Sequence, residues 1–232
     1  NYISSQDEVK DFNWHTLLRN YSDAGAEEME AIGNNSVRVM EHLLLDKQNG
    51  GSVINNITRA RENGRAVQDH ITKEVWQCLN DYHHLIRDKH IYTQVKSGDP
   101  VTALDSLIYQ GMLYHGTVDI TMARGEGFNY LNAGKFLERA ILSADMLNIK
   151  LTELGYKLEA PVELPALRYL LYSLSGYELY LKSHRGNLQA DFVIQQIVYN
   201  EQFPHSIAYC LKQLFRYFER LEPESLPENY KQ

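Results

Sequence analysis

Hydrophobic residues recur at steps of three and four along most of the chain, which is the spacing of one face of an α-helix. The longest such run predicts one helix over residues 129–157. No segment shows sustained alternation of polar and apolar residues with a period of two, the pattern of a half-buried strand. The fold class is therefore predicted to be all-α. The expected core face of the long helix consists of Leu137, Ala140, Ile141, Ala144, Leu147, Leu151 and Leu154.

The other predicted helices are placed by their capping residues and by the loops between them. We expect Ser36, Ser52, Thr72 and Asp99 to be N-caps, with Pro100 in the first turn after Asp99. The last ten residues or so are expected to form a frayed tail. The remaining predicted helices cover residues 12–21, 27–32, 37–45, 53–67, 73–86, 100–124, 166–183, 188–199 and 204–221.

The two ends of the chain resemble each other in sequence. At a constant offset of 154 residues, the segment 39–53 aligns with the segment 193–207. In the loop within each segment, Asp46 or Asn200 is followed six residues later by Ser52 or Ser206, and these side chains suit helix capping and bonds to nearby backbone groups. Any two amphipathic helices look alike, but the shared loop chemistry favours an internal duplication.

We therefore predict a single all-α domain over residues 1–232, a multi-helix bundle built from two similar halves. The halves cover residues 12–90 and 128–221, a bridging helix covers 100–124, and the tail covers 222–232. The counterpart of the long helix would lie before residue 12, so the N-terminal helix of the first half is expected to be missing. Because the chain begins with Asn1 rather than Met, we expect it to start within a longer protein.

Composition and motifs exclude several classes of function. A net charge of −7 argues against nucleic acid as a partner, and no apolar run approaches the roughly 20 residues of a membrane span. Two distant cysteines indicate a reducing compartment, so a cytoplasmic protein is expected. HExxH, paired CxxC, P-loop and GxSxG motifs are absent from the sequence. Only residues 81–84 place a carboxylate and an imidazole three residues apart, and a di-metal bundle would need two such repeats and two further carboxylates, so we expect no metal and no cofactor.

Two concentrations of charged residues are candidate sites. Glu138 and Arg139 are adjacent in the long helix, where neighbours point about 100° apart and cannot pair efficiently with each other. They would either line a polar cleft that binds a carboxylate or an amine, or join a buried ion-pair network that fixes helix packing. Arg61, Glu62 and Arg65 form the second concentration, which suits an anionic group. Arg61 and Glu62 are also the expected cross-helix partners of Arg139 and Glu138.

Three blocks of sequence resemble the signatures of the bacterial alpha-E family, whose helical domains are named for an E-R motif. Lys135 stands where arginine is usual in that family and Phe128 where tryptophan is usual, and the family's N-terminal helix with its own E-R motif is absent. The blocks, in the family order, are ARENGRAV with ITKEVW within 60–76, GFNYL with GKFLERA within 127–140, and EQFPHSI at 201–207.

The resemblance implies an all-helical domain whose function is uncharacterised. Such domains occur beside, or fused to, circularly permuted ATP-grasp proteins and transglutaminase-like proteins. The resemblance therefore implies a non-catalytic accessory or substrate-handling partner of a peptide ligase or peptide-modifying system. Two alternatives stay open: an enzyme that uses the polar residues of the two candidate sites for acid/base work or aminoacyl transfer, and a purely structural homo-oligomer.

Overall fold

The computed structural model describes residues 14, 18, 22, 24–97, 99–156, 164–185 and 188–221. Within these residues the chain forms eleven α-helices and no strand, which confirms the predicted all-α class. Contacts between residues divide the chain into two compact units, residues 1–123 and 124–232. Among the described helices, none has both the length and the apolar character needed to cross a membrane.

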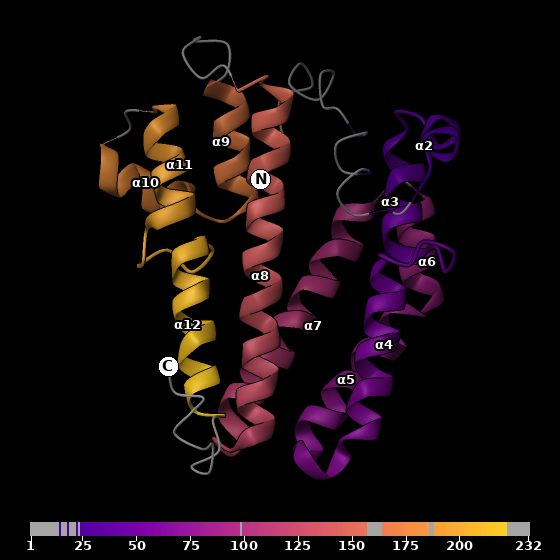
Figure 1. The fold of residues 1–232 in the computed structure, drawn as a ribbon. Helices are drawn as coiled ribbons and strands as arrows, with labels where there is room; N and C mark the ends of the chain where they lie inside the picture. Colours follow the sequence, from indigo (N-terminus) through magenta and orange to yellow (C-terminus); the bar gives the residue numbers. More distant parts are fainter. Residues whose placement is uncertain are drawn as a thin grey trace. The chain divides into compact units, whose positions relative to one another are not determined.

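In the first unit, the described residues from 24 on form six α-helices, which Figure 1 labels α2 to α7. The helix α5 packs against both α4 and α7, and α6 packs against α3 and α7. These contacts enclose a core formed mainly by leucine, isoleucine and valine side chains. The helices are α2 (Ala26–Ile32), α3 (Ser36–Leu45), α4 (Val53–Ala66), α5 (Lys73–Ile86), α6 (Lys89–Lys96) and α7 (Pro100–Thr121), with the short 3₁₀ helix η2 (Gln68–His70) between α4 and α5.

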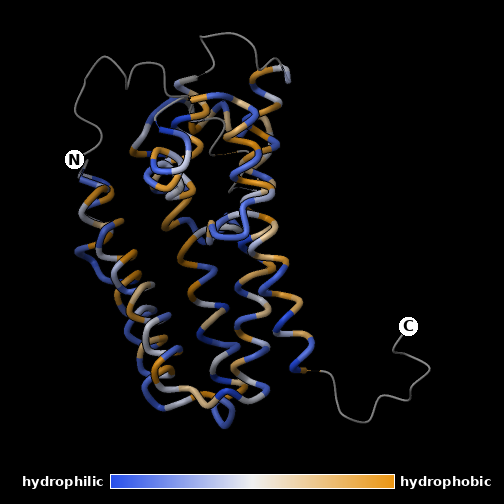
Figure 2. Tube along the Cα trace, turned by 90° about the vertical axis from the view of Figure 1, so that its left-hand side faces the viewer, coloured by the Kyte–Doolittle hydropathy of each residue, from blue (hydrophilic) through white to orange (hydrophobic). Residues whose placement is uncertain are grey.

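The starts of α3, α5, α6 and α7 follow from local side-chain chemistry, because a side chain at each N-cap accepts a backbone hydrogen bond. Thr72 accepts a hydrogen bond from the backbone N–H of Val75 at 3.3 Å, and Asp99 accepts one from Thr102 at 3.5 Å, so both predicted caps are confirmed. The N-cap of α3 is Asn35 rather than the predicted Ser36. Most helices contain both hydrophilic and hydrophobic residues in each turn (Figure 2). A helix that is buried on one side and exposed on the other has this composition.

The second unit contains the longest helix of the structure, α8 (Glu126–Glu153), with α12 (Ile207–Glu219) lying along it (Figure 1). Phe136 and Ala140 of α8 and Cys210 of α12 form one core cluster, and a larger cluster joins the remaining helices to the second half of α8. The remaining helices are α9 (Leu164–Ser173), α10 (Tyr177–His184) and α11 (Ala190–Tyr199).

The long helix differs from its prediction in its ends and in its core face. It begins one turn before residue 129 and ends at Glu153, because Gly155 and Tyr156 both adopt positive φ values of 57°. Leu137 and Ile141, predicted to be in the core, are exposed. The buried face is centred on Phe136, which packs against aromatic side chains of α12 and so sets the rotation of α8.

The single helix predicted over residues 166–183 is wrong, because the chain forms two helices there, α9 and α10. Between them Ser175 has a φ of 56°, and the N–H of Gly176 donates to the carbonyl oxygen of Leu171 at 2.7 Å. A Cβ atom at Gly176 would lie 2.6 Å from Cζ of Phe203, so the break allows a buried ring to pack on the backbone. The helix predicted over 12–21 lies mostly outside the described residues, as does the tail over 222–232.

Helix bounds repeat at the offset seen in the sequence. Subtracting 154 from the bounds of α11 gives 36–45, which are the bounds of α3. The same subtraction applied to α12 gives 53–65, against 53–66 for α4. The α3–α4 and α11–α12 helix hairpins therefore have nearly the same helix lengths and loop length.

The loops of the two hairpins also share hydrogen bonds. Asp46 Oδ1 accepts from the backbone N–H of Gln48 at 2.8 Å, and Asn200 Oδ1 accepts from that of Gln202 at 2.9 Å. Both loops end at a buried serine N-cap with extended backbone, Ser52 or Ser206. Local hydrogen bonds of this kind favour the same loop conformation in both hairpins.

Candidate functional site

Glu138 and Arg139, which form the ER pair of α8, point in different directions. Arg139 is half-buried, and its Nη1 donates a hydrogen bond to the carbonyl oxygen of Pro204 at 3.3 Å. Its guanidinium lies 5.5 Å from the centre of the Phe136 ring. Glu138 is exposed and has no hydrogen bond or ion pair with another residue in the described part of the chain. Arg139 therefore holds the loop before α12, whereas Glu138 faces solvent.

The loop that Arg139 contacts is ordered by its own side chains. Ser206 Oγ donates to the carbonyl oxygen of Asn200 at 2.6 Å and accepts from the backbone N–H of Tyr209 at 3.0 Å, as in a helix cap. In the corresponding loop of the first unit, Ser52 holds the same N-cap position. Its buried hydroxyl, however, has no hydrogen-bond partner among the described residues. The two serines thus occupy the same N-cap position but differ in their side-chain hydrogen bonds.

Burial and the charge of Arg139 affect two titratable groups near this loop. Burial, followed by the positive charge of Arg139, lowers the pKa of His205. Burial raises the pKa of the Cys210 thiol, and Arg139 opposes part of that rise. Cys210 is fully buried in the cluster it forms with α8. Because a thiol must ionise to react, Cys210 is a poor nucleophile in the folded unit.

The side of α8 next to Glu138 is apolar and exposed. Tyr130, Leu137 and Ile141 are 62%, 46% and 47% exposed, and their spacing places them along one line of the helix. Gly134 lies on the same side, and a Cβ atom there would meet nothing within 4 Å. We call Tyr130, Gly134, Leu137, Glu138 and Ile141 the α8 surface. Exposed apolar surfaces with a polar rim are typical of contacts with other proteins.

The second sequence-predicted group, Arg61, Glu62 and Arg65, lies together on α4. Arg61 Nη1 is 2.8 Å from Glu62 Oε1, and its Nε donates to Asn80 Oδ1 of α5 at 2.8 Å. Arg65 lies 3.9 Å from Glu62, mostly exposed to solvent. Since these residues belong to the first unit and the ER pair to the second, the expected pairing between the two groups stays a prediction.

A buried histidine on α5 lies near this group. Burial lowers the pKa of His83, and the positive charges of Arg87 and Arg61 lower it further. His83 Nε2 accepts a hydrogen bond from Arg87 Nη1 at 3.2 Å, because a guanidinium can only donate. The Arg87 guanidinium therefore contacts the His83 ring, and the positive charge of Arg61 also acts on it. Forked donors of this kind suit a carboxylate or a phosphate.

A hydrogen-bonded chain of side chains surrounds His42, at the end of α3, and was not predicted from the sequence. His42 Nε2 lies 2.7 Å from Ser22 Oγ, and His42 Nδ1 lies 2.9 Å from Asp46 Oδ2. The sequence-based prediction concerned carboxylates and imidazoles three residues apart, whereas His42 and Asp46 are four residues apart. That spacing could have revealed the pair, whereas Ser22 lies twenty residues from His42 and gave no such signal.

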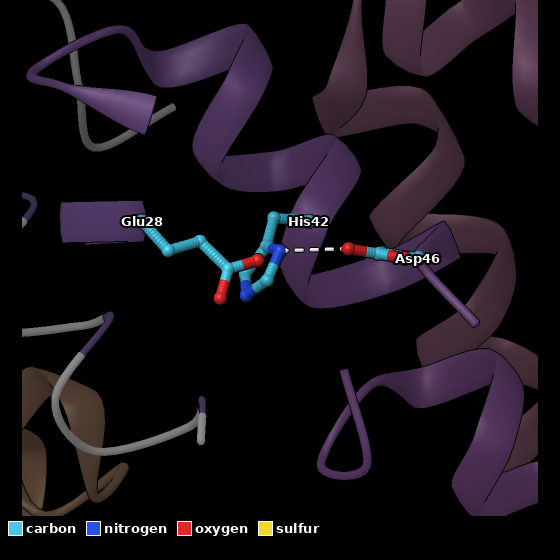
Figure 3. A group of neighbouring side chains, drawn as sticks. All are labelled: Glu28, His42 and Asp46. Carbon is cyan, nitrogen blue, oxygen red and sulfur yellow. Dashed lines mark hydrogen bonds and ion pairs between the residues drawn. The ribbon is translucent and has the colours of Figure 1, made fainter. Parts of the chain in front are cut away.

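A second carboxylate joins this group from α2. Glu28 and Asp46 lie on opposite sides of the His42 ring (Figure 3), and one ligand atom from each of the three residues lies within 4.8 Å of the others. Nitrogen and carboxylate oxygen ligands could hold a divalent metal ion. Both ring nitrogens of His42 already have hydrogen-bond partners. A metal ion would therefore have to replace the hydrogen in one of these two bonds.

Comparison with known proteins identifies the family. No curated protein and no solved structure matches the chain. One family model does match, and it covers residues 1–232. The family, Alpha-E, is described as a predicted alpha-helical domain with a conserved ER motif, which agrees with the helices of both units and with the adjacent Glu138 and Arg139. The chain therefore belongs to the Alpha-E family.

Proposed function

We propose that this Alpha-E domain is an accessory, substrate-handling partner of an ATP-grasp-type peptide ligase, or of a transglutaminase-like protein in a peptide-modifying system. The observation that carries the proposal is the orientation of the ER pair. Arg139 is used inside the second unit, where it holds the loop before α12. Glu138 instead faces solvent beside exposed Leu137 and Ile141. The choice of partner rests on the resemblance stated above.

The α8 surface indicates the chemistry of the partner's contact. Apolar side chains would cover Leu137 and Ile141, and an arginine or lysine would pair with Glu138. Binding of the partner would remove water from around Glu138, and the energy of the ion pair would then depend more strongly on its charges. An enclosed polar site around Glu138 would instead favour the enzyme alternative, but its side chain is exposed. The geometry therefore favours a binding role for this carboxylate.

The substrate-handling part of the proposal rests on the polar group of the first unit. Arg61 and Arg87 offer two guanidiniums near the buried imidazole of His83. We infer that this group binds a carboxylate of a peptide substrate, which is the kind of group that peptide ligases activate. Glu62 already occupies one side of Arg61, so the substrate would use the remaining donors of the guanidinium.

Binding of the purified protein to a circularly permuted ATP-grasp protein, the kind of protein beside which such domains occur, would test the proposal. We expect a stoichiometric complex, measured by isothermal titration calorimetry. Glu138→Lys should weaken the complex by about 10-fold or more, because it reverses the charge that meets the partner's cation. Leu137→Asp combined with Ile141→Asp should weaken it at least as much, because it places charges in the apolar contact.

Tyr199→Asp is the matched control, because Tyr199 ends α11 in the same unit and is 70% exposed. This variant should bind as the parent does. A ligase that does not bind, or one that binds all the variants equally, would contradict the proposal. Self-association of the protein through the α8 surface, measured by light scattering, would instead favour the homo-oligomer.

We also propose that the two halves of the chain arose by internal duplication. The offset of 154 residues relates α3 to α11 and α4 to α12, and it relates the Asx hydrogen bonds of their loops. A chance likeness of two amphipathic helices would not extend to the loop between them. An experimental structure in which the two hairpins superpose no better than unrelated helix pairs would refute the duplication.

A further inference from the structure

We propose that Ser22, His42 and Asp46 form a nucleophilic site for acyl transfer from an ester or an amide. Ser22 Oγ lies 2.7 Å from His42 Nε2, and His42 Nδ1 lies 2.9 Å from Asp46 Oδ2. A hydroxyl, an imidazole and a carboxylate joined in this order are the arrangement that activates a serine, on whatever fold it occurs. The proposal goes beyond the partner-binding role, because it gives the first unit a reaction of its own.

The direction of the hydrogen bonds suits a base. An ionised carboxylate can only accept, so the hydrogen between His42 and Asp46 belongs to His42 Nδ1. In the neutral imidazole Nε2 then accepts, and the Ser22 hydroxyl donates to it. Asp46 is itself held in place, because its other oxygen accepts from the backbone N–H of Gln48 at 2.8 Å. The imidazole is therefore oriented to take the serine proton.

The burial of the group also suits a base. His42 is 7% exposed, whereas Ser22 is half-buried, so Ser22 is the more accessible of these two residues. The backbone N–H of Ala24 donates to Ser22 Oγ at 3.0 Å and would stabilise negative charge there. Glu28 lies beside the ring and would favour the imidazolium formed during attack (Figure 3). Because it would also repel anions, we expect a neutral or cationic acyl donor.

The second half of the chain shows that the fold does not need these three residues. The residues 154 positions later are Gly176, Gln196 and Asn200. Gln196 Nε2 donates to the carbonyl oxygen of Gly176 at 2.8 Å, and Asn200 makes the same loop hydrogen bond as Asp46. Neutral side chains thus make the structural contacts there, without a nucleophile or a base. This comparison uses the proposed duplication, whereas the hydrogen bonds of Ser22 and His42 stand without it.

The reaction proceeds in two balanced steps. Ser22 Oγ forms a bond to the carbonyl carbon while its proton passes to His42 Nε2, and the leaving alcohol or amine departs with that proton. The product is an ester of Ser22. Water, or an acceptor amine or hydroxyl, then attacks this ester, and its proton returns through His42 to Ser22 Oγ. No oxidant, reductant or metal is required.

Reaction of the purified protein with a neutral alkyl fluorophosphonate would test the site. Ser22 Oγ would bond to phosphorus and fluoride would leave, which gives a stable adduct that mass spectrometry can assign to one residue. We expect labelling at Ser22 and none in Ser22→Gly. His42→Gln should slow the labelling by about 100-fold or more, because it removes the base. Asp46→Asn should slow it by about 10-fold or more, because it removes the charge that orients the base.

Each of these variants installs the residue that the second half carries at the same place, so each is chosen to keep the structural contacts. Thermal unfolding of each variant checks that the fold is retained. Ser36→Ala changes an exposed serine at the start of α3 and should react at the parental rate. Absence of labelling at Ser22 in the parent protein, or labelling at an unchanged rate in folded His42→Gln, would overturn the proposal. No ligase is present, so failure here is distinct from failure of the partner-binding role.

Discussion

In the second unit, Gln196 Nε2 meets the carbonyl oxygen of Gly176 at 2.8 Å. In the first unit, the residues 154 positions earlier, His42 and Ser22, meet through Nε2 and Oγ at 2.7 Å. The same two positions are thus in contact in both units, but one pair uses neutral amide groups and the other an imidazole and a hydroxyl. The local fold sets which positions touch, and the residue types set whether the contact is structural or reactive.

The outer faces of the two hairpins differ as well. On α4, Ile57 is 7% exposed, and α5 packs against this helix. On α12 the residue 154 positions later, Leu211, is 51% exposed, and Phe218 on the same side is also 51% exposed. A face that is covered by a helix in the first unit is therefore an open apolar surface in the second. This difference agrees with a partner that binds the second unit.

The largest expected effect is a difference in stability between variants of the two hairpin loops. Phe203 is fully buried, whereas Asn49, which lies 154 positions earlier, makes hydrogen bonds to His42 and Gly51. Phe203→Ala should lower the free energy of unfolding by about 3–5 kcal/mol, because it leaves a cavity. Asn49→Ala should cost about 1–3 kcal/mol, because its partners lose their hydrogen bonds. Urea denaturation measures both, and equal losses would contradict this account.

A smaller difference in stability is expected between alanine variants of two glycines, each of which lies close to a neighbouring side chain. A Cβ atom at Gly176 would lie 2.6 Å from the buried Phe203 ring, and one at Gly64 would lie 2.6 Å from the end of Leu79. Gly176→Ala should cost about 1–3 kcal/mol, because the ring cannot move away. Gly64→Ala should change the stability by no more than about 1 kcal/mol, because Leu79 can rotate and alanine favours the helix. Thermal unfolding of the two variants compares them; a neutral Gly176→Ala would disprove the packing argument.

The smallest effect concerns His205, whose counterpart 154 positions earlier is Gly51 and cannot titrate. Burial, and then Arg139, lowers the pKa of His205 below its ordinary value of about 6.5. As the pH falls below that value the unfolded chain binds a proton first. The stability that neutral His205 contributes is therefore complete above about pH 6.5 and is lost as the pH falls through the folded pKa.

Arg139→Gln removes one of the two causes and should raise the pKa of His205 toward its ordinary value. An NMR titration of the imidazole in the parent and the variant measures the change. A pKa that stays the same, or that falls, would show that Arg139 does not act on this group. His83, whose pKa is lowered by burial and by Arg87 and Arg61, is the internal control, and its titration should not change.

The sequence predicts those elements whose causes are local. The caps at Thr72 and Asp99 and the Asx loops at Asp46 and Asn200 follow from side chains that bond backbone groups a few residues away. The break between α9 and α10 could not be predicted in this way. It depends on Gly176 lying under the ring of Phe203, which is distant in sequence.

The candidate sites were less predictable than the helices. Helical periodicity shows that Glu138 and Arg139 point apart, but not which of them faces the core. That depends on the packing of Phe136 against aromatic side chains of α12. The contact of Ser22 with His42 joins separate segments, and neither residue belongs to a recognisable motif. Sequence patterns therefore identified the ER pair as a feature, whereas only the structure shows the Ser22, His42 and Asp46 chain.

The chemical reactivity of Cys210 reports how often α12 separates from α8 in the second unit. Its thiol is fully buried in the cluster with Phe136 and Ala140, and burial raises its pKa. An alkylating reagent in solution can reach the sulfur only after α12 has moved away from α8. The rate at which iodoacetamide modifies Cys210 therefore measures how often this helix pair separates. If a partner clamps the two helices together, the reaction should slow in its presence, even where the overall melting temperature stays the same.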